Sequence, residues 1–117
     1  MKNAKNFMMI FRFQPNESYQ PTPEEMAEQG QAWGSFIGNL AMRERLVNTN
    51  QLGFEGKKLN ADLSVSEGIN IAGGKTLGGN MVVAANSIDE AIEMAKDCPI
   101  LRMGGEVEVR NILPMTA

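Results

Sequence analysis

The most constraining feature of the sequence is a sharply delimited strand–helix pattern that begins at residue 77. Residues 77–85 contain two glycines followed by an apolar run, which predicts a strand. Ser87 is a good helix N-cap, and Glu90 stands at the capping-box position three residues later. The spacing of Ala91, Ile92 and Ala95 predicts the buried face of this helix.

The same pattern closes with a second strand. Pro99 cannot continue a helix and ends the preceding one. Gly104 and Gly105 then turn the chain into residues 106–112, which alternate between charged and apolar side chains. The sequence therefore predicts a strand–helix–strand unit in its last forty residues.

The first part of the chain predicts a matching unit. Residues 6–13 are apolar on both faces of a strand and end in an arginine, Arg12, followed by Phe13. A helix follows, because Thr22 is a good N-cap, with Pro23 at the first helical position and Glu25 at the capping-box position. We expect this helix to end near Arg45 and to bury four residues at helical spacing, namely Met26, Trp33, Ile37 and Leu40.

The middle of the chain is less regular. We expect residues 46–56 to be irregular, residues 58–65 to form a strand, and residues 69–71 to return as a short strand after a turn. Residues 72–76 read as a flexible loop. The predicted element order is β-α-β-β-α-β, which builds an α+β, ferredoxin-like fold with an antiparallel sheet and both helices on one face.

The first strand predicts a partner for the other face of that sheet. Two helices cover one face only, yet residues 6–13 are apolar on both sides. A second copy of the chain is the simplest cover, so we expect a homodimer. In the last strand Val107 and Val109 would face the helices, while Glu106, Glu108 and Arg110 would point to the second face. There these charges would pair with one another, with Arg12, or with a bound ligand.

Composition limits the possible functions. The chain has 117 residues, which predicts one domain spanning residues 1–117. Its net charge of −3 argues against nucleic-acid binding. No apolar run approaches the ~20 residues of a membrane span, and no signal peptide is apparent, so we expect a cytoplasmic protein. The chain has one cysteine and no histidine, so we expect no disulfide, no metal and no cofactor.

Several local motifs have both a functional and a structural interpretation. Gly74-Lys75-Thr76 resembles the end of a phosphate-binding loop, but Ile69 stands where the first glycine is required, which favours a structural loop. Cys98 lacks a histidine to activate it, which favours a small buried residue. Trp33 could line a pocket with Tyr19 or lie in the core, and Arg12 could clamp a carboxylate or pair with Glu108.

Glycines recur every fourth residue in the first helix, at Gly30, Gly34 and Gly38. They form a smooth stripe along one side of the helix. Close packing by another backbone or a ligand is the interpretation we favour, and an exposed face that tolerates glycine is the alternative.

Taken together, these segments resemble the YciI-related family, and more closely its DGPF branch. The resemblance rests on residues 77–79, 87–91, 96–101 and 104–110, and at the start on residues 7–12, 22–26 and 31–33. It implies a ferredoxin-like fold, a dimeric α/β barrel and a cleft that serves as a candidate active site. Roles in this family are mostly unassigned; some members are linked to sigma-factor regulation and others resemble small degradative enzymes.

The sequence departs from the family at its polar signature. The Asp-Gly-Pro-Phe turn falls on residues 67–70, where only the acid and the glycine are kept, as Glu67 and Gly68. The lysine–glutamate pair that follows the turn is absent, and so is the histidine of the histidine–aspartate pair associated with the YciI branch. The catalytic residues are therefore unknown.

We interpret the protein as a binder of a small molecule, with an anion as the candidate, in a cleft between the sheet and the dimer partner. The candidate pocket residues are Arg12, Trp33, Glu67 and Arg110. One alternative is a cofactor-free enzyme in which Arg12 holds the substrate and Glu67 is the base. The other is a regulatory module that binds a protein partner.

Overall fold

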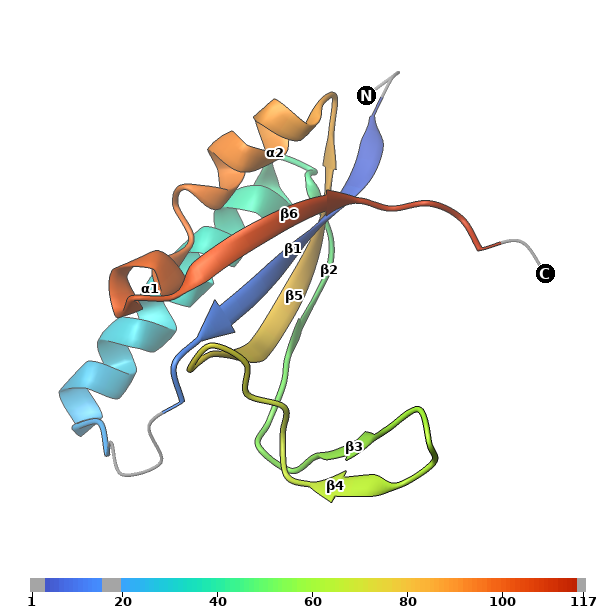
Figure 1. The fold of residues 1–117 in the computed structure, drawn as a ribbon. Helices are drawn as coiled ribbons and strands as arrows, with labels where there is room; N and C mark the ends of the chain where they lie inside the picture. The colour runs from blue at the N-terminus through green and yellow to red at the C-terminus, as the bar shows by residue number, and fades with distance from the viewer. Residues whose placement is uncertain (1–3, 16–19, 116–117) are drawn as a thin grey trace.

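The structure, a computed structural model, describes residues 4–15 and 20–115. It confirms the predicted ferredoxin-like α+β class: a four-stranded antiparallel sheet carries the helices on one face (Figure 1). The strand order is β2-β5-β1-β6. The elements of this body are β1 (Lys5–Phe13), α1 (Pro23–Met42), β2 (Leu46–Gln51), β5 (Thr76–Ala85), α2 (Ile88–Ala95), the short 3₁₀ helix η1 (Pro99–Met103) and β6 (Glu106–Asn111).

Strand β1 lies in the middle of the sheet, as its apolar side chains on both faces predict. It pairs with β5 on one side and with β6 on the other, so Met9 has Met81 and Val109 as its neighbours. Phe7, Met9 and Phe11 point toward the helices and are buried there with Leu40. The alternate residues of β1 therefore belong to the face that the helices leave open.

Both helices start where their capping residues predict. In α1 the Glu25 backbone nitrogen donates to Thr22 Oγ1 at 3.1 Å, and the Thr22 nitrogen donates back to Glu25 Oε1 at 3.3 Å. In α2 the Glu90 nitrogen donates to Ser87 Oγ at 3.2 Å. Helix α1 ends at Met42, slightly before the predicted end. Within the described residues, no helix combines the length and apolarity needed to cross a membrane.

Two predicted core positions are wrong. Met26 is 59% exposed because it lies in the first turn of α1, and Ile92 is 39% exposed, its place in the core being taken by Met94. Val107 and Val109 pack against the helix-side core, as predicted for β6.

The middle of the chain differs most from its prediction. Residues 46–51 form the edge strand β2 rather than an irregular segment, and residues 69–71 form no strand. The predicted strand over residues 58–65 is instead a hairpin, made of β3 (Lys57–Leu59) and β4 (Val65–Glu67), in a separate two-stranded sheet. Its turn is held by side chains: Asn60 Nδ2 donates to the Ser64 carbonyl, and the Ser64 nitrogen donates to Asp62 Oδ1.

This hairpin projects from the body of the protein (Figure 1). We call residues 53–75 the arm. The arm presents apolar side chains to solvent, since Leu59 is 67%, Leu63 78% and Val65 55% exposed. The radius of gyration is 16.0 Å, against the about 13 Å typical of a compact domain of this length.

The arm leaves and rejoins the sheet at adjacent points. The Leu52 nitrogen, just after β2, donates to the Gly78 carbonyl in β5 at 3.0 Å. The strands approach closely here: a Cβ at Gly79 would come within 2.5 Å of the Asn50 carbonyl oxygen. Glycine is therefore required where β2 meets β5.

The glycine stripe of α1 is open. Apart from its own helix backbone and chain neighbours, a Cβ built at Gly30, Gly34 or Gly38 would have no atom of a described residue within 4 Å. Gly34 and the buried Phe36 are two residues apart, and so about 200° apart around the helix. The stripe therefore points away from the sheet, and none of the described residues provides the close packing predicted for it.

Candidate functional site

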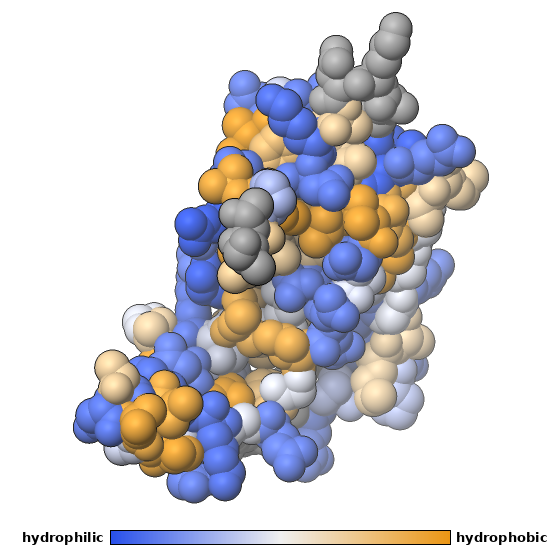
Figure 2. Space-filling view, turned by 90° about the vertical axis from the view of Figure 1, so that its right-hand side faces the viewer, coloured by the Kyte–Doolittle hydropathy of each residue, from blue (hydrophilic) through white to orange (hydrophobic). Residues whose placement is uncertain are grey.

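The sheet face opposite the helices combines apolar and charged side chains. On β1, Met8 and Ile10 are half-buried on this face. The register of β1 with β6 sets Arg110 beside Met8 and Glu108 beside Ile10. Figure 2 looks onto this side of the molecule and shows hydrophobic areas among hydrophilic ones. We call this surface the open face.

Most charges on the open face are paired. Arg12 Nη1 lies 2.8 Å from Glu108 Oε1, and Lys75 Nζ lies 3.2 Å from Glu106 Oε2. Arg110 makes no ion pair with any described residue. The pair of Arg12 with Glu108 is the contact named in the structural interpretation of Arg12, and Arg110 is the arginine of the open face that lacks such a pair within the described residues.

The other half of the open face is lined by side-chain amides. Asn50 of β2 and Asn80 of β5 are cross-strand neighbours, and Asn50 Nδ2 donates to Asn80 Oδ1 at 3.1 Å. Asn80 is also opposite Ile10 of β1. The open face therefore runs from neutral amides at β2, over apolar residues, to the charged side chains of β6.

Two of the predicted pocket residues lie elsewhere. Trp33 is on the helical side, with its ring centroid 5.6 Å from that of Phe11 and 6.2 Å from that of Phe36. Glu67 is on the arm, where its carboxylate lies 3.6 Å from Lys57 Nζ. The structure therefore brings Arg12 and Arg110 onto one surface but not Trp33 or Glu67. Tyr19, the predicted companion of Trp33, is outside the described residues.

The glycine-rich loop before β5 forms a tight structural turn. The Ala72 nitrogen donates to the Lys75 carbonyl, and the Lys75 nitrogen donates to the Ala72 carbonyl. Gly73 and Gly74 occupy the left-handed region, with φ of 61° and 78°. Thr76 is buried and its hydroxyl donates to the Asn70 carbonyl at 2.8 Å. These contacts favour the structural interpretation of Gly74-Lys75-Thr76 rather than its interpretation as a phosphate-binding loop.

Cys98 is a core residue. Its side chain is buried, and burial raises the pKa of the thiol to about 11. A thiol with such a raised pKa is a poor nucleophile at neutral pH. No group of three or more potential metal-ligating side chains (His, Cys, Asp or Glu) occurs in the part of the chain that the structure describes.

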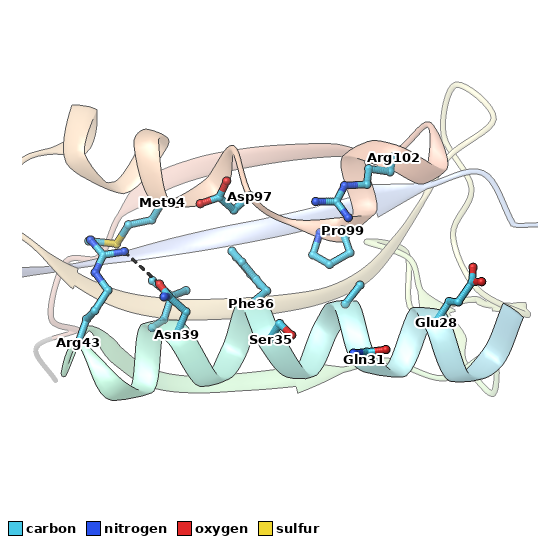
Figure 3. A pocket seen from close by; sticks show the side chains of 12 residues that line it. Glu28, Gln31, Ser35, Phe36, Asn39, Arg43, Met94, Asp97, Pro99 and Arg102 are labelled. Atoms are coloured by element: carbon cyan, nitrogen blue, oxygen red, sulfur yellow. Dashed lines mark hydrogen bonds between the residues drawn. The ribbon is translucent and has the colours of Figure 1, made fainter. Parts of the chain in front are cut away.

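A second surface feature, which sequence reasoning missed, is a groove on the helical side. It has a volume of about 460 Å³ and lies between α1 and the segment that joins α2 to η1 (Figure 3). Its floor is apolar, formed by the buried residues Phe36, Leu40, Met94 and Pro99. Its walls are polar and come from both sides. We call it the helical groove.

Fold and surface together define a small ferredoxin-like α+β protein with an uncovered sheet face. The family model of the YCII-related domain matches residues 7–116, and the chain belongs to this family. A search of the curated proteins found no match.

Proposed function

We propose that the protein is a homodimer that binds a small anionic molecule between the open face and the partner copy. In this arrangement the two open faces approach each other, as in the dimeric α/β barrel that the family resemblance implies. Both copies present the same apolar and charged open face, so the two faces can meet in a two-fold symmetric contact.

The apolar surface supports the dimer. In one copy Met8 and Ile10 on the open face are half-buried, and Leu59, Leu63 and Val65 on the arm are exposed. A two-stranded hairpin on its own is at best marginally stable in water. Cover from a second copy would remove this apolar surface from water and would also stabilise the arm.

The ligand proposal rests on the missing ion-pair partner of Arg110 within the described part of the chain. Arg110 is the arginine of the open face without an acidic partner in the described residues, whereas Arg12 is held by Glu108 at 2.8 Å. Arginine binds carboxylates with two parallel hydrogen bonds. Enclosure by the partner would lower the local dielectric and strengthen this contact.

The test is a comparison of two arginine variants. Wild-type protein, Arg110→Ala and Arg102→Ala would be titrated with malonate by calorimetry and examined by native mass spectrometry for a co-purified small acid. Arg102 is the matched control, because it also lacks an acidic partner but lies at the helical groove. We expect Arg110→Ala alone to lose malonate and any co-purified acid. Equal binding by all three proteins would refute the assignment of Arg110.

A further inference from the structure

The helical groove has the dimensions of a chain-binding site. Gln31, Ser35, Asn39 and Arg43 follow one another along its α1 wall at intervals of four residues. Each interval advances about 6 Å along a helix. In an extended peptide, backbone groups on the same side recur about every 6.6 Å. The polar row of α1 therefore nearly matches the repeat of an extended backbone.

The chemistry of the row also suits a peptide backbone. Side-chain amides both donate and accept hydrogen bonds, as backbone amides do. Asn39 Oδ1 accepts from Arg43 Nη1 at 3.3 Å, and its Nδ2 donates to none of the described residues. The side chains of Gln31 and Ser35 likewise make no hydrogen bond to a described residue. Their bonding capacity is available to a ligand lying over the apolar floor.

The charges define the ends of the ligand. Figure 3 shows Arg43 at one end of the groove and Arg102 toward the other, with Asp97 on the wall between them. Neither arginine forms an ion pair with a described residue. Two separated arginines favour a ligand with a carboxylate near each end, and Asp97 can accept from a backbone N–H between them. Glu28 lies at the Arg102 end and opposes that carboxylate.

We propose that the helical groove binds an extended peptide segment of about six residues, with an acidic group near each end. The length follows from α1, since Gln31 to Arg43 spans about 18 Å of helix axis. This surface is on the opposite side of the sheet from the open face, so it is independent of the small-molecule cleft proposed above.

The test uses fluorescence anisotropy with the full-length protein and two labelled octapeptides. Both alternate threonine and valine, and one has glutamate at each end while the other has lysine. We expect saturable binding of the glutamate peptide only. Arg102→Ala should weaken it at least tenfold, and Ser35→Glu, which places a negative charge in the middle of the wall, should weaken it similarly.

One further variant should strengthen peptide binding, and another should leave it unchanged. Glu28→Gln should tighten binding of the glutamate peptide severalfold, because it removes the opposing charge beside Arg102. Arg110→Ala, on the open face, should leave peptide binding unchanged. Equal binding of the two peptides would overturn the proposal, and so would unchanged affinity in both Arg102→Ala and Ser35→Glu when circular dichroism shows that they are folded.

Discussion

The tip of the arm offers a sharp test of the dimer, through the substitution Leu63→Asn. Leu63 is 78% exposed and has a φ of 72°, a left-handed conformation that is unfavourable for leucine. Asparagine adopts this conformation more readily. The substitution should therefore keep the hairpin turn, or improve it, while it removes the apolar side chain that we expect to contact the partner.

The expected loss of affinity follows from the exposed area. Complete burial of a leucine side chain contributes about 1.5–3 kcal/mol. Because Leu63 is 78% exposed in one copy, the part available to an interface is about 1.2–2.3 kcal/mol. A two-fold symmetric dimer contains this contact twice, so the loss is about 2.4–4.6 kcal/mol, or a rise in the dimer Kd of roughly 50- to 2,000-fold.

Sedimentation velocity over a dilution series measures this Kd. The control is Met42→Gln, which removes an 87% exposed apolar side chain from the end of α1, away from the arm. We expect the control to dissociate like wild-type protein. The reasoning fails if Leu63→Asn dissociates no more easily than the control, and the dimer itself is refuted if wild-type protein is a monomer at micromolar concentration.

Three other predictions concern stability. Gly34→Ala should stabilise the protein by about 1 kcal/mol in urea unfolding, because no other part of the described chain lies within 4 Å of the new Cβ, whereas Gly79→Ala should destabilise it because of the Asn50 carbonyl. Because burial raises the pKa of Cys98 from 9.0 to about 11, the folded state keeps a proton that the unfolded state loses. Stability should therefore fall as pH rises from 9 toward 11, and less so in Cys98→Ala. Arg45→Ala should cost about 1–3 kcal/mol by thermal unfolding, since it breaks the part-buried 2.7 Å pair with Glu90; an unchanged Tm would contradict this.

The parts of the fold that could be predicted are those with strong local signals. Thr22 and Ser87 mark helix starts through hydrogen bonds to residues three positions on, which depend only on neighbouring sequence. Strand β1 could be placed in the centre because its apolar side chains need cover on both faces. Each of these signals is complete within a few residues of the element that it defines.

The middle segment could not be predicted because its signal is ambiguous. Weak alternation over residues 58–65 is consistent with one strand, but two short strands around a turn give the same pattern. The hairpin is decided by side-chain hydrogen bonds at that turn, in which Asn60 Nδ2 donates to the Ser64 carbonyl and Asp62 Oδ1 accepts from the Ser64 nitrogen. Strand β2 was missed because its side chains are mostly polar and exposed, as an edge strand allows.

The candidate sites likewise differ in whether the sequence could predict them. The pair of Arg12 and Glu108 was accessible to sequence reasoning, because alternation places both on one face of adjacent strands. The helical groove was not, since it exists only where α1 meets η1 in space. Its polar row at four-residue spacing was visible in the sequence, but such a row is equally typical of an ordinary solvated helix face.

The hydrogen bond between Leu52 and Gly78 has a consequence for engineering and for divergence in this family. Because the chain departs and returns at neighbouring positions, the arm is an insertion into what is otherwise a β2–β5 hairpin. Replacing residues 53–75 with a short turn should leave the strand register intact, and the resulting miniature would retain both helices. Among the described residues, two side-chain pairs join the arm to the body, namely the rings of Phe13 and Phe54 and the ion pair of Lys75 with Glu106. We expect sequence change in the rest of the arm to leave the body unaltered.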